Sequence, residues 1–353
     1  MTQEPVPSPM SISSIPSPAT SGGRALLLKV AELRAWLFLA ILIVFFEAWA
    51  RIVYDTTFIL NPYNLQSIGI FAVAPLLLAM GQTFVIISAG IDLSVGFTMG
   101  LASVVAAHAA NLGPVIGLGP VPAMLLGLAA GVAVAFVPGL VNGWLIAHLR
   151  VPPFIGTLGM YGVARGTAFL IAGGTTVPVA NAWFATIGNG RIAGIPTVVL
   201  ITVIVALAMH YLLSQTRFGQ HTYAIGANRN AALRAGIDVR RHAIKLYLLS
   251  AVCAGLAGSL YAARFAAGAA QAGEPLLLDS IAAVVIGGAS LFGGSGTIGG
   301  TIAGALVIAV IQYGLVFIDV EPFWQFVAVG VVIIISVLVD QSQRRLARGR
   351  QDD

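Results

Sequence analysis

Charged residues are scarce in this chain. Asp, Glu, Lys and Arg make up only 9% of its 353 residues, whereas hydrophobic residues make up 58% and the mean hydropathy is +0.94. This composition excludes a soluble protein, because there is too little charge to cover a water-facing surface, and it indicates the lipid bilayer as the solvent. The apolar runs lack the period-two alternation of membrane-barrel strands. The sequence therefore predicts an all-α, polytopic membrane protein.

Several kinds of chemistry are also missing. Cys253 is the only cysteine, which excludes intrachain disulfides and cysteine metal sites. Lys29 and Lys245 are the only lysines, and neither follows the glycine of a Gly-Lys-Ser/Thr phosphate loop, so the chain should not hydrolyse ATP by itself. The five histidines show no paired metal-ligand spacing, and no Gly-x-Ser-x-Gly turn marks a hydrolase. We expect no catalytic residue, metal site or cofactor in this chain.

Ten apolar segments can be placed as membrane spans, because roughly twenty residues cross the hydrocarbon core. Basic residues near span ends resist translocation, and with the amino terminus inside, most of the eighteen fall on the cytoplasmic side. We therefore expect a multi-pass membrane protein with both termini in the cytoplasm. The net charge of +5 then reflects topology and not nucleic-acid binding. The predicted spans are 36–54, 67–90, 94–110, 121–147, 154–173, 195–213, 244–267, 281–295, 297–317 and 323–340.

The chain divides into three parts by composition. Residues 1–23 are rich in proline and serine and are predicted to be a disordered cytoplasmic tail. Residues 24–340 form the membrane domain, and residues 341–353 form a basic cytoplasmic tail. Within the membrane domain, 214–243 is a polar, arginine-bearing connection between apolar runs that are otherwise joined by short loops. A connection of this kind is predicted to meet something outside the membrane.

Four charged residues fall inside predicted spans, where an ionisable group is costly and is usually paired or functional. Glu47 and Arg51 are one helical turn apart, so we interpret them as a structural pair. Arg264 is close to a span end and can extend its side chain to the interface. Arg165 lies deep in the fifth span with no acid one turn away. It must face the protein interior or an aqueous path, and a structural and a functional role both remain open for it.

The polar connection contains a short helix signal. Asn228 can cap a helix that Gly236 would end. So few residues do not hold a helix in water unless it is docked, and the small side chains at 231, 232 and 235 would fit a shallow groove. The segment resembles the Glu-Ala-Ala-x-x-x-Gly coupling loop of ABC importer permeases, with Asn230 where that loop often has Glu. The resemblance implies that the residues in contact with an ATP-binding subunit are Asn228, Asn230, Ala231, Ala232, Arg234 and Gly236.

Other segments narrow the resemblance to the monosaccharide branch of these permeases, which serves ribose, xylose, arabinose, galactose and autoinducer-2 systems. They are residues 90–96, residues 152–159 with the Arg165-Gly166 pair after them, and residues 278–294. The resemblance implies four kinds of partner: a cytoplasmic ATP-binding subunit, a periplasmic or extracellular substrate-binding protein, a second permease subunit in a homodimer or a paralogous heterodimer, and the lipid bilayer. It also implies two halves of inverted topology and a location in the bacterial inner (cytoplasmic) membrane.

Glycine-rich breaks interrupt the apolar runs at 90–96 and at 287–296, one in each half of the chain. Paired breaks expose backbone groups that can line a translocation path, although for each glycine taken singly close helix packing is an equal alternative. The candidate path residues are Asp92, Ser94, Arg165, Ser290, Gly287 and Gly288.

These observations predict the membrane subunit of an ABC importer that moves a monosaccharide or a similar small polar solute inward. The energy would come from ATP hydrolysis on a separate chain. The alternative is a secondary transporter driven by an ion gradient, in which Asp92 would carry a proton or a sodium ion. A channel is a third class.

Overall fold

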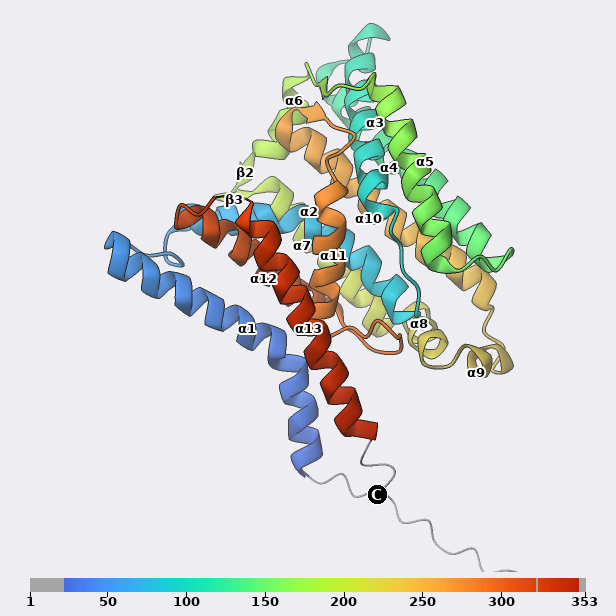
Figure 1. Cartoon of the computed structure of the whole chain (residues 1–353). Coiled ribbons are helices and arrows are strands. Elements are labelled where there is room, and N and C mark those ends of the chain that lie inside the picture. The colour runs from blue at the N-terminus through green and yellow to red at the C-terminus, as the bar shows by residue number, and fades with distance from the viewer. Residues whose placement is uncertain (1–21, 322, 349–353) are drawn as a thin grey trace, which may run out of the picture.

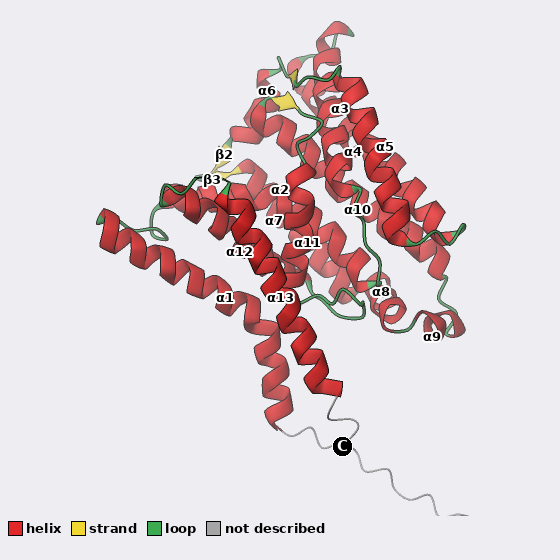
Figure 2. Ribbon diagram, in the orientation of Figure 1, coloured by secondary structure: helices red, strands yellow, loops and turns green. Residues whose placement is uncertain are grey.

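The computed structural model describes residues 22–321 and 323–348 (Figure 1). Within these ranges the chain forms thirteen helices and four strands of two residues each (Figure 2). The predicted class, a mostly helical membrane protein, is confirmed. The predicted disordered tail 1–23 lies outside the described residues except for Gly22 and Gly23, which begin the first helix. The end of the predicted basic tail, residues 349–353, also lies outside them.

Among the residues that the structure describes, eight helices are long and apolar enough to cross a membrane. They are α1 (Gly22–Tyr54, apolar from Leu33), α2 (Pro62–Ile87), α3 (Val95–Val115), α4 (Pro120–Ala147), α5 (Pro153–Ala172), α7 (Thr197–Gln215), α10 (Val239–Phe265) and α12 (Ile298–Phe317). Three of them, α2, α4 and α5, have a proline at their start, where its fixed φ and missing N–H suit the first turn. Apolar length therefore predicted these helices well.

The predicted span 281–295 is wrong as one continuous helix. Helix α11 begins earlier, at Glu274, and ends at Ile286 after thirteen residues. Gly288 then takes a left-handed φ of +92°, and no helix is resumed until Ile298. Hydropathy misplaced the boundary because the loop after α11 is itself apolar. The tenth predicted span corresponds to α13 (Trp324–Arg348), whose apolar part is Trp324–Ile335, so this helix continues into the predicted basic tail.

Helix α10 is the centre of the bundle, where it packs against α2, α3 and α4 (Figure 1). Small residues permit this close packing: a Cβ at Gly255 would lie only 2.8 Å from the Ala135 Cβ of α4. Helix α12 packs on α2, α1 packs on α12, and α5 packs on α3. The outer helices keep large apolar side chains exposed, among them Ile41 and Leu170. Such a surface suits contact with lipid acyl chains.

Short elements join the long helices at one end of the bundle. Helix α6 (Ala182–Asn189) packs on α10, and strand β1 (Val177–Pro178), which follows α5, pairs antiparallel with β4 (Ala267–Gly268), which follows α10. A second pair joins β2 (Arg191–Ile192) to β3 (Ile195–Pro196) before α7. The strand pair β1–β4 therefore ties the end of α5 to the end of α10.

The charged pair in the first span is structural, as the sequence predicted. Glu47 forms an ion pair with Arg51 at 2.7 Å, and its Oε2 accepts hydrogen bonds from the backbone N–H groups of Phe58 at 2.8 Å and Ile59 at 3.0 Å. The Thr57 hydroxyl also donates to this carboxylate. Glu47 thus fixes the connection between α1 and α2.

Candidate coupling and translocation sites

Two short helices form the polar connection between α7 and α10. They are α8 (Arg217–Ala227) and α9 (Arg229–Arg234), and they lie at the end of the bundle away from the strand pairs (Figure 1). The Asn228 Oδ1 accepts a hydrogen bond from the Ala231 N–H at 3.0 Å, which caps the start of α9. Gly236 has a φ of +83° and donates to the Leu233 carbonyl, while the Ile237 N–H donates to Ala232. The predicted helix and both of its end signals are confirmed.

Ala232 faces inward, which differs from the sequence expectation that it meets another subunit. Its side chain is 4% exposed and packs in a small apolar cluster with Ile225 of α8 and Val239 of α10. This inward orientation of Ala232 could not be predicted from the sequence, because a six-residue helix is too short to show a periodic pattern of apolar residues. Ala232 therefore holds α9 on the chain. The other residues of the predicted coupling set are exposed: Asn228, Asn230, Ala231, Arg234 and Gly236.

Helix α8 packs on the end of α2, which leads into the first glycine-rich break, and on the second break itself. A Cβ at Gly226 would overlap the carbonyl oxygen of Ile87, the last residue of α2. The same carbonyl accepts a hydrogen bond from the Gly294 N–H at 2.8 Å, and the Tyr223 hydroxyl donates to the Gly296 carbonyl at 2.6 Å. Burial raises the pKa of the Tyr223 hydroxyl above its ordinary value, so this group remains a neutral donor. A displacement of α8 would therefore shift the backbone at both breaks.

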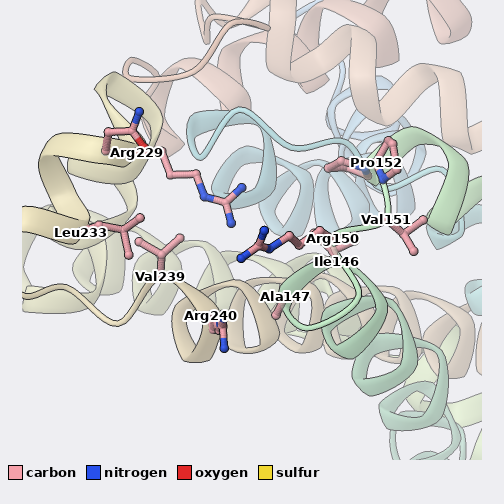
Figure 3. Close-up of a pocket in the computed structure, with 11 residues that line it drawn as sticks. Ile146, Ala147, Arg150, Val151, Pro152, Arg229, Leu233, Val239 and Arg240 are labelled. Carbon is pink, nitrogen blue, oxygen red and sulfur yellow. The ribbon is translucent and has the colours of Figure 1, made fainter.

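A groove of about 550 Å³ separates α9 from the connection between α4 and α5 (Figure 3). Figure 3 shows the guanidinium groups of Arg229 and Arg150 extending toward one another across it. A smaller cavity of about 90 Å³ shares Arg229 and Pro153 with the groove and reaches Gly90 at the first break. The groove is lined by Ile146, Ala147, Arg150, Val151, Pro152, Pro153, Arg229, Asn230, Leu233, Val239 and Arg240.

Asp92 and Ser94, two of the candidate path residues, come together at the first break and are buried inside the bundle. Asp92 is 1% exposed. Its Oδ1 accepts hydrogen bonds from the N–H of Ser94 at 3.0 Å and from its hydroxyl at 2.6 Å, and its Oδ2 accepts from the Ser250 hydroxyl of α10 at 2.9 Å. The Asn142 amide of α4 donates to the Ser94 hydroxyl at 2.9 Å. The carboxylate therefore joins the break to α4 and α10.

Sequence reasoning missed the partners of Asp92. Ser250 and Asn142 are single polar residues inside apolar runs, and Gln82 of α2, which donates to the Asp92 carbonyl, is another. Their only signal was their polarity within a span, which predicts contact with another helix and not with lipid. Among the described residues, no group of three or more His, Cys, Asp or Glu side chains is placed to hold a metal ion.

Arg165 lies apart from the Asp92 cluster, on an exposed face of α5. Its Cζ is 5.3 Å from the ring centroid of Phe97 in α3, a cation–π distance. The Tyr161 ring packs edge-on against the same Phe97, with ring centroids 4.7 Å apart, and the Tyr161 hydroxyl donates to Glu274 of α11 at 3.3 Å. Glycines 159, 162 and 166 leave open space along this helix.

The remaining predicted path residues belong to the loop after α11. Gly287 packs against the backbone of Gly300 in α12. The Ser290 N–H donates to the Ser295 carbonyl at 3.0 Å, and the Ser290 hydroxyl accepts from the Phe292 N–H at 3.1 Å. Gly288 adopts the left-handed turn described above. The six predicted path residues therefore occupy three places: the buried cluster, the open face of α5, and this loop.

The arrangement is that of a transport-system permease component: a helical bundle with glycine-rich breaks and an exposed helix pair at one end. Residues 64–337 match the family described as "Branched-chain amino acid transport system / permease component", and the chain belongs to this family. It is 36% identical to the D-allose transport system permease protein AlsC of Escherichia coli K12 over 284 residues, which cover 80% of this chain and 85% of that protein. It is 40% identical to the ribose import permease protein RbsC of the same organism over 272 residues, 76% and 82% of the two chains.

A third relative is the ribose import permease protein RbsC of Bacillus subtilis, which is 39% identical over 292 residues and matches 81% of this chain and 88% of its own. The chain is thus a multi-pass transport subunit of the inner membrane and not an enzyme. Membership of the family implies two further proteins, an ATP-binding subunit and a substrate-binding protein. The resemblance found from the sequence motifs is confirmed.

Proposed function

We propose that this chain is the membrane permease of an ABC importer for a monosaccharide or a similar small polar solute. The observation that carries the proposal is the contact of α8 with both breaks beside the exposed, capped α9. Relatives over most of the chain are named for allose, ribose, galactose and xylose, which supports a sugar as the solute. The chain lacks a phosphate loop, so the ATP is hydrolysed on its partner.

In this proposal the ATP-binding subunit docks on the exposed surface of α9. Asn228, Asn230, Ala231 and Arg234 supply that surface, while Ala232 keeps α9 joined to α8 and α10. Movement of the docked helix pair displaces α8, and α8 then moves the end of α2 and the loop after α11 together. The coupling is mechanical at Gly226, because its contacts with Ile87 and Gly294 are backbone to backbone and leave no flexible side chain to absorb a shift.

We also propose ten crossings, with α11 and α13 added to the eight long helices, and both termini in the cytoplasm. Repeated packing supports two inverted halves, α2–α5 and α10–α13. Helix α3 packs on α4, α5 and α10, and α11 packs correspondingly on α12, α13 and α2. Five crossings, namely α2, α3, α4, α5 and α7, separate the start of α2 from that of α10, so equivalent helices run in opposite directions.

The sequence interpretation paired the break at 90–96 with the break at 287–296, and this inverted symmetry pairs them differently. The two breaks at 90–96 and 287–296 both lie on the side of the bundle that carries α8, whereas inverted equivalents would enter the bundle from opposite membrane faces. The equivalent of the break after α2 is the non-helical segment 266–273 after α10. Its Gly273 carbonyl would lie 2.7 Å from a Cβ at Gly96, so the two breaks of this pair also approach each other closely.

A second permease subunit would cover the open face of α5, where an arginine at membrane depth is unsuited to lipid. The substrate-binding protein would approach from the side of the strand pairs. The ion-gradient alternative gains no support from Asp92, because its carboxylate is buried and accepts three hydrogen bonds from Ser94 and Ser250. We therefore interpret the Asp92 carboxylate as a structural link between helices.

The test is uptake of radiolabelled ribose by proteoliposomes that contain this chain. We expect uptake only when the ATP-binding subunit, ATP and the substrate-binding protein are all present. Each omission, and a catalytically dead ATP-binding subunit, should abolish it. Uptake by the permease alone in response to a proton or sodium gradient would contradict the proposal and restore the secondary-transporter alternative.

A further inference from the structure

The groove between α9 and the α4–α5 connection has an unbalanced charge. Arg150, Arg229 and Arg240 line it, and no Asp or Glu does. Among the described residues, no carboxylate forms an ion pair with any of the three. The acidic residue nearest in sequence, Asp238, is paired with Arg241 at 3.2 Å instead. The groove therefore holds positive charge that nothing within the described chain neutralises.

Two of the three guanidinium groups converge. Arg229 comes from α9 and Arg150 from the turn after α4, and Figure 3 shows them extending into the space between those elements. Like charges repel, so a pair facing the same space is stabilised when an anion enters between them. A guanidinium offers donors in a fixed fork that matches a carboxylate. The geometry of the groove is that of a carboxylate receptor.

The apolar part of the lining narrows the choice of occupant. Leu233 of α9 is 50% exposed, and Pro152 and Val151 line the opposite wall. A volume of about 550 Å³ is far more than one carboxylate needs and lies within the roughly 300–1,000 Å³ of ordinary ligand pockets. A protein side chain entering with its apolar neighbours would fill both the charged and the apolar parts.

We propose that the groove receives an acidic side chain, Asp or Glu, from the ATP-binding subunit, with apolar neighbours that pack on Leu233. This inference rests on the proposed function, because α9 is the surface that the ATP-binding subunit contacts. It adds a second point of attachment, the α4–α5 connection, which leads directly into α5 and its Arg165. The acidic side chain bridges α9 to that connection.

The bridge has a mechanical consequence. Helix α9 makes its main contacts with α8 and α10, while the far wall of the groove belongs to α4 and α5. A carboxylate held by Arg229 and Arg150 joins α9 to the α4–α5 connection only while the subunits are docked. The smaller cavity beside Arg229 extends from this position to Gly90 at the first break.

The experiment measures the affinity of the purified ATP-binding subunit for the permease in nanodiscs of zwitterionic lipid. The variants are Arg150→Gln, Arg229→Gln and their combination. The matched control is Arg217→Gln, which removes an exposed arginine from the neighbouring helix α8, outside both the groove and the proposed docking surface of α9. Both groove residues are exposed, so their replacement should leave the fold intact, which elution as a monodisperse protein checks.

We expect each groove variant to raise the dissociation constant about tenfold and to weaken its salt dependence, and the control to change it less than about twofold. Arg229→Glu should abolish binding, and one Asp→Lys or Glu→Lys replacement in the ATP-binding subunit should restore it. An unchanged affinity in the groove variants, or an equal loss in the control, would overturn the inference.

A parallel set of nanodiscs contains phosphatidylglycerol and distinguishes a lipid occupant. If the groove variants bind the ATP-binding subunit normally but lose a tightly held phosphatidylglycerol in native mass spectrometry, the groove is a lipid site and the inference is wrong. If the unaltered permease does not bind the ATP-binding subunit at all, the proposed function itself fails. The two failures are therefore distinguishable.

Discussion

Replacement of Gly226 by alanine tests whether α8 transmits movement to the helix breaks. The added Cβ would overlap the Ile87 carbonyl oxygen and lie 2.7 Å from the Gly294 nitrogen. Both are backbone atoms, so no side chain can turn away and α8 itself must shift. Overpacking of this kind costs about 1–3 kcal/mol, and loss of the hydrogen bond from Gly294 to Ile87 adds about 0.5–1.5 kcal/mol.

The sum, about 2–4 kcal/mol, corresponds to a shift of roughly 30- to 1,000-fold in the equilibrium between a seated and a displaced α8. The exposed surface of α9 is unchanged, so the ATP-binding subunit should still dock. We therefore expect Gly226→Ala to hydrolyse ATP in proteoliposomes while its sugar uptake per ATP falls severely. The measurement is the ratio of labelled sugar imported to phosphate released.

The matched control is Gly299→Ala, which adds the same methyl group on α12 where nothing lies within 4 Å. Alanine also suits a helix better than glycine, so this variant should keep normal coupling. A monodisperse Gly226→Ala protein with an unchanged ratio of uptake to hydrolysis would refute the idea that α8 acts through its contact with Ile87.

Three further predictions separate packing from docking and transport. Ala232→Glu buries a charge in the cluster that holds α9, so protease cleavage within the polar connection should become faster. Ala231→Glu changes an exposed residue, so it should leave that connection resistant to protease and weaken only binding of the ATP-binding subunit. Equal protease resistance in both variants would contradict the inward position of Ala232. Glu47→Ala removes the carboxylate that accepts the Phe58 and Ile59 N–H groups between α1 and α2. It should lower the thermal unfolding midpoint in detergent more than Glu47→Gln, which keeps one acceptor oxygen. Identical midpoints would argue against the structural role of Glu47. Arg165→Leu should reduce sugar uptake without changing binding of the ATP-binding subunit, and normal uptake would make this arginine a tolerated structural residue.

The sequence predicted those features that depend on local chemistry. Apolar length placed the long helices, and the Asn228 cap with Gly236 placed α9, because both signals are complete within a few residues. The end of α11 was misplaced since hydropathy does not distinguish an apolar loop from a helix. Local signals were sufficient for elements but not for every boundary.

The candidate site was predictable only in part, because its geometry depends on residues far apart in the chain. The inward direction of Ala232 is set by Ile225 and Val239 from two other helices. Asp92 is held by Ser250, 158 positions away in sequence, and nothing in either residue alone indicates the other. Arg165 was singled out from the sequence as a charge deep in a span, but its contact with Phe97 could not be inferred.

The strand pair between β1 and β4 gives α10 a fixed point. The C-terminal end of α10 is joined to the end of α5 through this strand pair. The N-terminal end of α10 lies beside α9, where Val239 packs against Ala232. With 27 residues and about 1.5 Å of rise per residue, α10 is a rod about 40 Å long. A rod pivoting at one end by about 5° moves its other end by about 3.5 Å for that length. A small rotation of α10 about the two-residue ladder would therefore correspond to a displacement the size of a side chain at the surface where α9 is exposed.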